Sequence, residues 1–280
     1  MPTIMRAFQL QTRDSLTFLV CTPLLAFGVL VATSTRPRQE HDASAGAWQG
    51  ESGAYAGDGR RGTARAFAQF LAAVGFAQRS VLTLRQRHTN RCVFLEDAEV
   101  STWMNEPPLA DAVVTRSSDV VLGILTADCA PIFIFDPQTG VCAAIHAGWR
   151  GTLGRIVERT AEAMVTHFGT RLDVCRVAIG PTIGPCCYEV GPDVLERFRR
   201  EFPYAEDLIS TPTPQSRARL DLVNANVRQL LDWGFRREHI FVSGLCTACH
   251  PQLFFSHRRD SRIKGRSGLM LSVIGKMWPS

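Results

Sequence analysis

A cysteine and a histidine flank a strong turn signal in the segment TADCAPIFIFDPQTGVCAAIHAGWRG, residues 126–151. The tetrapeptide DPQT at 136–139 is typical of a β-turn, because proline presets the backbone angle at the second position and aspartate caps the first. If that turn joins two antiparallel strands, Cys129 lies opposite His146 at the open end of the hairpin. Opposed side chains have Cβ atoms ~4.5–5.5 Å apart, which suits a shared metal ion or a thiol–imidazole proton relay.

A third nitrogen ligand is available at the end of another expected strand. His88 is one candidate, and spacing alone does not favour it over His250 or His257. Two imidazoles and one thiolate, with a fourth position open, suit a catalytic zinc ion whose bound water ionises near neutral pH. Copper also binds imidazole and thiolate tightly, so spacing does not decide the metal. A metal-free alternative uses Cys129 as the nucleophile and His146 as its base.

Length and composition describe a globular chain. Its 280 residues are 45% hydrophobic, and 31 basic against 26 acidic residues give a net charge of +5. A chain of this size buries enough surface to fold without disulfides or a metal, and its dispersed basic residues do not predict nucleic-acid binding. The nine cysteines are too few for a disulfide scaffold. They predict a reducing compartment, and hence a cytoplasmic location, with thiols that are buried, reactive or metal-bound.

One apolar run bears on the location of the protein. Residues 15–34 carry no charge and follow two arginines, as in a signal peptide. However, Pro23 and Gly28 interrupt the run, and β-branched residues are abundant. We therefore predict two core strands, 17–21 and 28–33, in place of an export signal or a membrane span.

The remaining pattern favours an α/β fold of the α+β type, with mixed β-sheet layers and flanking helices in a single domain over residues 1–280. A long, mobile loop is expected at 35–65, where Gly, Ala and Ser dominate. Apolar periodicity predicts the other elements. Helices are expected over 64–74, 152–168, 192–202 and 222–234, and strands over 80–84, 111–115, 120–125, 131–135, 141–145, 175–180 and 239–245.

Five motifs in the second half of the chain are distinctive: TADC (126–129), HAGWRG (146–151), AIGPTIGPCCYEVG (178–191), LDLVNANVRQL (220–230) and CT…FFSHRRD…GR (246–266). On these motifs, the sequence from about residue 78 onward resembles the YfiH-type family, also described as multicopper polyphenol oxidases or laccase-domain proteins. The resemblance implies an α/β fold shared with a bacterial toxin deamidase domain, and a mononuclear site with His88, Cys129 and His146 as metal ligands. It implies zinc-dependent purine nucleoside phosphorolysis, acting on adenosine, inosine, guanosine or methylthioadenosine, together with adenosine deamination. Copper-dependent polyphenol oxidation is the alternative.

Phosphorolysis requires an anion site, a purine pocket and assistance to the leaving base, so purine nucleosides and phosphate are the expected partners of a monomer or small homo-oligomer. Arg150 and the amides of a helix beginning after Gly151 are candidates for phosphate, because helix N-termini favour anions. In deamination Asp128 is expected to move protons, or alternatively to orient His146. Further candidates are Arg258, Arg259 and Arg266 for phosphate, and Trp149, Phe254 and Phe255 for stacking on a base.

Two positions depart from the family pattern and bear on specificity. The segment 86–89 reads Gln-Arg-His-Thr in place of a QVHG-like motif, which adds a charge and removes a glycine beside the expected ligand. Upstream, Gly57-Asp58 is retained, but the first helix carries Ala66-Phe67 where an Asn-Arg pair is usual. The expected metal ligands are unaffected by either departure.

The other conspicuous cysteines have competing interpretations. Residues 246–250 spell Cys-x-x-Cys-His, the attachment sequence for c-type haem. Together with the signal-like run, this motif would describe an exported electron-transfer protein, but it follows a strand, so we favour the family interpretation. The adjacent Cys186 and Cys187 are expected to shape a pocket wall, with a redox or metal role as the alternative.

Overall fold

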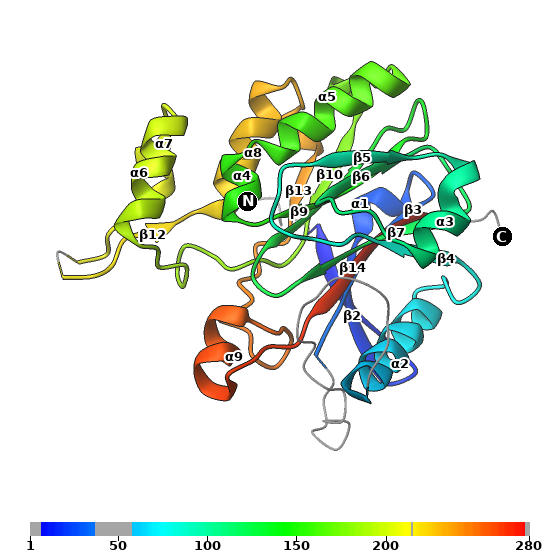
Figure 1. Cartoon of the computed structure of the whole chain (residues 1–280), viewed down its shortest axis with the longest axis horizontal. Coiled ribbons are helices and arrows are strands. Elements are labelled where there is room, and N and C mark those ends of the chain that lie inside the picture. Colours follow the sequence, from blue (N-terminus) through cyan, green and yellow to red (C-terminus); the bar gives the residue numbers. More distant parts are fainter. Residues whose placement is uncertain (1–6, 37–57, 214, 278–280) are drawn as a thin grey trace, which may run out of the picture.

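A computed structural model describes residues 7–36, 58–213 and 215–277 of the chain. Two six-stranded mixed sheets dominate this part (Figure 1). The first sheet contains, in spatial order, β1 (Phe8–Arg13), β2 (Leu16–Cys21), β3 (Val29–Ser34), β14 (Met270–Lys276), β7 (Val120–Thr126) and β4 (Ser80–Thr83). The second contains β13 (Ile240–Val242), β10 (Arg176–Ile179), β8 (Ala130–Phe135), β9 (Cys142–Ala147), β6 (Ala112–Thr115) and β5 (Cys92–Leu95).

Helices cover the outer faces of both sheets, so the predicted mixed α+β fold is confirmed. In Figure 1, α5 and α8 lie over the second sheet, α2 lies against the first, and α6 and α7 project to one side. The bounds are α1 (Thr22–Leu25), α2 (Asp58–Ala73), α3 (Val100–Asn105), α4 (Trp149–Leu153), α5 (Ile156–Phe168), α6 (Pro192–Glu201), α7 (Ala205–Leu208), α8 (Leu222–Asp232) and α9 (His257–Lys264), with a small sheet of β11 (Ile209–Ser210) and β12 (Arg219–Leu220).

The core lies mainly between the two sheets. Successive strand residues point to opposite faces, and β8 shows the consequence: Phe133 packs into the cluster shared by both sheets, whereas Ile132 and Ile134 face the helices. The second cluster includes Ile156 of α5 and Leu230 of α8. Strands of the second sheet are therefore apolar on both faces, and polar side chains are left to the strand ends.

The apolar run at 15–34 forms β2 and β3, separated by α1, which has Pro23 in its first turn. The two predicted strands are confirmed within one or two residues. All of β3 is buried, and it pairs with both β2 and β14 inside the first sheet. In the described segments of the chain, no helix has the length and apolar character needed to cross a membrane.

The β8–β9 hairpin forms as predicted, but its register is wrong by two residues. Pro131, not Cys129, pairs with His146. The amide of Asp136 donates to the carbonyl of Val141 at 2.9 Å, so the closing pair encloses four residues where the predicted β-turn enclosed two. Because the shift is an even number, Cys129 keeps the same face of the hairpin as His146.

Two helix predictions also need correction. The helix expected over 152–168 is divided into α4 and α5, because Arg155 between them has a left-handed φ of 59°. The first long helix begins at Asp58, so residues 58–65 of the expected loop are helical. Residues 37–57 lie outside the described part of the chain, and the expected mobility of that loop stays a prediction.

Candidate active site

The three predicted metal ligands converge at one end of the sheets. One ligand atom from each of His88, Cys129 and His146 lies within 4.8 Å of the other two, and the group is able to hold a metal ion. Cys129 Sγ is 3.7 Å from His88 Nε2, and the two imidazole centroids are 4.8 Å apart. His146 is buried, Cys129 is half-buried and His88 is exposed. One sulfur and two nitrogens reaching one point, open on the His88 side, match the donor set of a catalytic metal site.

Asp111, which the sequence analysis did not identify, organises two of these ligands. Its Oδ1 lies 2.7 Å from His146 Nδ1, and the backbone amide of His88 donates to the same oxygen at 3.0 Å. The amide and hydroxyl of Thr89 donate to Oδ2 at 2.7 and 2.6 Å. This fully buried carboxylate therefore fixes the backbone of the segment that carries His88, and it also fixes the orientation of the His146 ring.

The alternative role predicted for Asp128, that of orienting His146, belongs to Asp111 in the structure. The sequence signal that could have identified Asp111 is its position immediately before the short strand β6, in the sequence DAVVT, whose residues are all buried. An aspartate at such a position is buried and needs several hydrogen-bond donors, which marks it as a structural carboxylate. Its donors, however, lie more than twenty residues away in sequence.

Asp128 lies in the cavity wall with both carboxylate oxygens engaged. Oδ1 accepts from the Thr247 hydroxyl at 2.6 Å, and Oδ2 accepts from the Arg258 amide at 2.7 Å. The residue has a left-handed φ of 92° and immediately precedes Cys129. Asp128 thus joins the Cys129 segment to the loop before α9 and to α9 itself.

The charges at the site favour an ionised thiol. Burial opposes ionisation of Cys129, but the imidazoles of His146 and His88 outweigh it and lower its pKa from the ordinary 9.0 to about 6. Burial likewise disfavours a charged His146, yet the Cys129 thiolate and the Asp111 carboxylate raise its pKa to about 9. For Asp111, hydrogen bonds from His146 and Thr89 prevail over burial and lower its pKa to about 2. The metal-free site is therefore a thiolate–imidazolium–carboxylate array at neutral pH.

This array predicts the reactivity of Cys129 in chelator-treated protein. Its alkylation by iodoacetamide should increase through a midpoint near pH 6, because the thiolate is the nucleophile and forms above that pH. Peptide mapping by mass spectrometry at graded pH measures the midpoint. Replacement of His146 by alanine should move the midpoint upward, and added zinc should protect the thiol. A midpoint near 9 in the unsubstituted protein would contradict the proposed charge array.

Gly148 provides the space in which the site forms. A Cβ at this position would lie 2.8 Å from Cys129 Sγ and 2.9 Å from His88 Cδ2. Gly148→Ala should therefore separate the two ligands and weaken metal binding at least about tenfold, the scale on which displaced metal-site geometry acts. Equilibrium dialysis with zinc measures the change, and a circular dichroism spectrum equal to that of the unsubstituted protein shows that the fold persists. Unchanged zinc affinity would show that this contact does not limit the site.

The cluster opens into a cavity of about 720 Å³. This volume lies within the range of ligand pockets, roughly 300–1,000 Å³. The described part of its wall includes cationic, aromatic and apolar side chains in addition to the Cys–His cluster. They are Arg150, Arg258, Arg266 and His257, then Trp149 and Tyr188, and then Leu84, Leu125 and Leu269.

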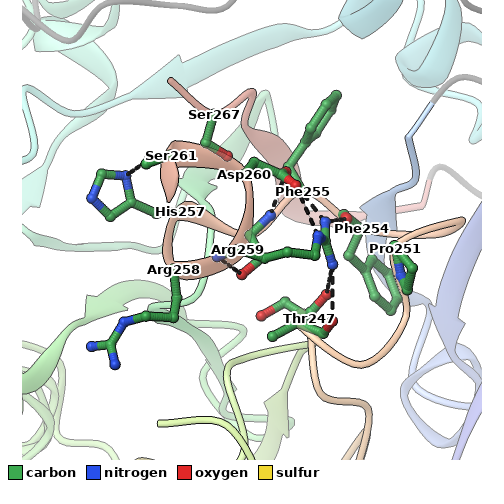
Figure 2. A network of polar contacts seen from close by, with 12 residues as sticks. Thr247, Pro251, Phe254, Phe255, His257, Arg258, Arg259, Asp260, Ser261 and Ser267 are labelled. Atoms are coloured by element: carbon green, nitrogen blue, oxygen red, sulfur yellow. Dashed lines mark hydrogen bonds and ion pairs between the residues drawn. The ribbon is translucent and has the colours of Figure 1, made fainter. Parts of the chain in front are cut away.

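Three of the predicted binding residues have structural contacts instead. Figure 2 shows the guanidinium of Arg259 turned toward backbone carbonyls, to which it donates at Thr247 (2.9 Å) and Phe254 (2.7 Å). Phe254 is fully buried in the core, and Phe255 packs against that core with the Arg36 guanidinium over its ring. The predictions that Arg259 binds phosphate and that the two phenylalanines stack on a base are therefore not supported by their placement.

The predicted anion site on helix amides also needs correction. Gly151 lies inside α4, whose N-cap is Gly148, and the amide of Thr152 donates to the Gly148 carbonyl at 2.8 Å. Arg150 remains at the cavity, with its guanidinium 4.4 Å from the centre of the Trp149 ring. The Thr152 amide is therefore used within the helix, and the Arg150 side chain remains a candidate donor to an anion.

Comparison with known proteins shows the family and the fold. The family model described as multi-copper polyphenol oxidoreductase laccase matches residues 33–276. The chain belongs to this family. A purine nucleoside phosphorylase, YlmD of Geobacillus stearothermophilus, is 42% identical over 173 residues, covering 60% of this chain and 61% of that protein. The adenosine deaminase RL5 of an unknown prokaryotic organism is 36% identical over 187 residues, covering 65% of this chain and 71% of that protein.

The laccase-domain fold extends beyond the segments that align in sequence. The crystal structure of YlmD from Geobacillus stearothermophilus matches with a TM-score of 0.80 at 30% identity, covering 98% of this chain and 100% of that one. In the sequence comparison, by contrast, the chain spans 61% of the YlmD relative's length. The family resemblance predicted from the motifs is thereby confirmed.

Proposed function

We propose that the protein is a zinc-dependent purine nucleoside phosphorylase, a pentosyltransferase of broad nucleoside specificity. One observation carries the proposal: a single cavity of about 720 Å³ is lined by the Cys–His cluster together with cationic and aromatic side chains. These side chains are Arg150, Arg258 and Arg266, and Trp149 and Tyr188. The relative named as a purine nucleoside phosphorylase supports it. A thiolate ligand also fits the reducing cytoplasm expected from the cysteine content.

His88, Cys129 and His146 would hold the zinc ion. Their donor set suits zinc, and the bond from His146 Nδ1 to Asp111 leaves Nε2 as the ligand atom, as in carboxylate–histidine–zinc sites. A zinc ion bound there would supply a Lewis acid beside the arginines. Copper fits the same donors, and a copper-dependent polyphenol oxidase is the alternative that the family description suggests.

The arginines of the cavity are suited to phosphate. Within the described part of the chain, neither Arg150 nor Arg266 forms an ion pair, and Arg258 donates to the Glu189 carbonyl at 2.5 Å. Guanidinium groups bind phosphate oxygens in a planar, two-pronged geometry. We assign these arginines to the phosphate nucleophile, and Asp128 to holding the wall that carries Arg258.

The aromatic side chains are suited to the purine. Trp149 presents a ring to the cavity, and burial raises the pKa of Tyr188 so that its hydroxyl stays protonated. In phosphorolysis a phosphate oxygen bonds to C1′ of the pentose as the C1′–N9 bond breaks, and the base leaves with the electron pair and gains a proton. Tyr188 is a hydrogen-bond donor that can assist this departure.

Adenosine deamination is proposed as a second activity of the same cavity, because a relative is named as an adenosine deaminase. Water would add at C6 of the purine, and the exocyclic nitrogen would leave as ammonia. A metal-free cysteine hydrolase that uses Cys129 and His146 remains the other alternative, and it is favoured by the lowered pKa of Cys129.

The decisive experiment is a product assay with zinc-loaded protein. Adenosine, inosine, guanosine and methylthioadenosine are incubated with and without phosphate, and free base and pentose 1-phosphate are quantified by liquid chromatography. The proposal expects equal amounts of both products, formed only when phosphate is present. Absent turnover, base release without phosphate, or phenol oxidation confined to copper-loaded protein would overturn it. Inosine formed from adenosine without phosphate identifies the deaminase activity.

A further inference from the structure

Four further cysteines form a second sulfur cluster outside the lining of the cavity. The Sγ atoms of Cys186, Cys187, Cys246 and Cys249 all lie within 4.8 Å of one another. Cys249 Sγ is 3.5 Å from Cys186 Sγ and 3.4 Å from Cys187 Sγ. Cys246 is buried, Cys187 is half-buried and the other two are exposed. The sequence supplies these sulfurs as an adjacent pair and a Cys-x-x-Cys pair about sixty residues apart.

The spacing of the sulfurs corresponds to a single bound ion. Zinc–sulfur bonds of about 2.3 Å in a tetrahedral site place sulfurs about 3.8 Å apart and never more than about 4.6 Å. The Sγ–Sγ distances from Cys249 are 3.4 and 3.5 Å, close to the tetrahedral value. All pairs of sulfurs lie within 4.8 Å, close to the upper limit for a single zinc ion. A disulfide would require about 2.0 Å, and the nine cysteines of the chain are all free.

Backbone amides already point at one of these sulfurs. The amide of Gly184 donates to Cys246 Sγ at 3.2 Å, and the amide of Cys249 donates to the same sulfur. Amide donors of this kind stabilise a thiolate, because hydrogen bonds to a charged acceptor are stronger than those to a neutral one. The backbone around Cys246 therefore favours the thiolate form of this residue, and this observation is independent of the distances between the sulfurs.

We propose that Cys186, Cys187, Cys246 and Cys249 bind a second, structural zinc ion. A tetrahedral set of four thiolates is typical of structural zinc sites, and a complete Cys₄ set leaves no open position for catalysis. Binding releases the protons of the thiols that are still protonated and requires no oxidant or reductant. The same placement argues against covalent haem at residues 246–250, because Cys246 is only 7% exposed and its sulfur faces the other three.

The zinc would join two loops, each of which contributes to the cavity wall or contacts a residue of it. One loop follows β10 and the other follows β13, parallel neighbours in the second sheet whose pairing continues in a bridge between Thr182 and Cys246. Tyr188 of the cavity wall comes directly after the first cysteine pair. Thr247, which donates to Asp128, follows Cys246.

Arg259 holds the backbone of the second of these loops. Its guanidinium donates to the carbonyl of Thr247 at 2.9 Å (Figure 2). It also donates to the carbonyl of Ala248 at 3.0 Å, so both residues between the two cysteines of the Cys-x-x-Cys pair are held. The loop is thus held at its backbone by Arg259 and would be held at its sulfurs by the metal.

Metal counting in reduced protein tests this proposal without reference to activity. Protein purified under anaerobic conditions with zinc is analysed by elemental analysis and native mass spectrometry. Cys249→Ser and Cys186→Ser, both at exposed positions, should each lose one zinc per chain relative to the unsubstituted protein. Cys92→Ser, at a half-buried cysteine outside both clusters, should lose none. Zinc content that is unchanged in both the Cys249→Ser and Cys186→Ser variants would overturn the proposal.

A second measurement avoids any dependence on those variants folding. In Cys129→Ala protein, whose catalytic cluster lacks its thiolate, cobalt substitution should give the charge-transfer absorption and d–d bands of a tetrahedral four-thiolate site. Absence of these bands would overturn the proposal. A disulfide among the four cysteines, detected as an intact mass 2 Da lower in protein purified anaerobically without added reductant, would overturn it as well. A failure of nucleoside turnover alone would overturn the proposed function and leave this result unaffected.

Discussion

Replacing Cys129 by alanine is expected to remove the metal of the Cys–His cluster and to lower the proposed nucleoside phosphorolysis about 10²- to 10³-fold, the scale on which a single electrostatic group at a reacting centre acts. The reason is geometric as well as chemical. Cys129 supplies the sole sulfur of the cluster, between an exposed His88 and a buried His146. Zinc content by elemental analysis and kcat/KM for inosine measure the two effects together.

The matched control is Cys142→Ala, which removes a buried thiol from the start of β9, the same strand that carries His146. This variant should lose stability through its small cavity, on the order of 1 kcal/mol, while it keeps zinc and turnover. If Cys129→Ala retains its zinc and full turnover, neither the ligand assignment nor the proposed mechanism holds. Loss of turnover with zinc retained would instead favour the metal-free nucleophile interpretation of Cys129.

Asp111→Asn should have the second largest effect, because it changes binding and folding at once. The carboxylate of Asp111 accepts hydrogen bonds from several donors, including the amides of His88 and Thr89. The amide group of an asparagine would place an N–H against some of these donors, which leaves them without an acceptor. We expect zinc affinity to fall about 10- to 100-fold and the free energy of unfolding to fall by about 3 kcal/mol. Zinc titration and urea denaturation measure the two quantities.

The stability loss in metal-free protein should also depend on pH. The pKa of Asp111 in the folded protein is lowered from 3.8 to about 2, so its stabilising contribution is present above about pH 4 and disappears as the pH falls toward 2. The difference in unfolding free energy between the unsubstituted protein and Asp111→Asn should therefore decrease over that interval. A difference that is constant down to pH 2 would contradict the assigned hydrogen bonds.

Asp136→Asn provides a matched control for Asp111→Asn. Asp136 is also fully buried, and it accepts hydrogen bonds from the amide of Gln138 at 2.8 Å and the hydroxyl of Thr139 at 2.6 Å. It lies at the opposite end of the β8–β9 hairpin from the cluster. Its substitution should lower stability similarly and leave zinc affinity unchanged. Equal losses of zinc affinity in both variants would show that the effect of Asp111 is only a general loss of folding.

Local pattern was sufficient to predict most elements, because hydrophobic periodicity and turn chemistry act over a few residues. The two strands within 15–34 and the β8–β9 hairpin formed as expected. The register of that hairpin did not, because a β-turn signal specifies where the chain reverses but not how many residues the connection encloses. The break at Arg155 was missed for a similar reason, since the apolar stripe continues on both sides of it.

The sequence alone determined the family, the fold class and the three candidate ligands His88, Cys129 and His146, because these depend on residue types within short motifs. Only the tertiary structure decided which polar side chains form hydrogen bonds to these ligands and which line the cavity. Asp111 reaches His146 across two neighbouring strands, and Arg259 is committed to backbone carbonyls although it stands beside the cavity residue Arg258. The four sulfurs from residues 186 to 249 likewise meet only because β10 and β13 are parallel neighbours. Such contacts depend on which strands lie side by side, and strand order is set by the packing of the whole chain.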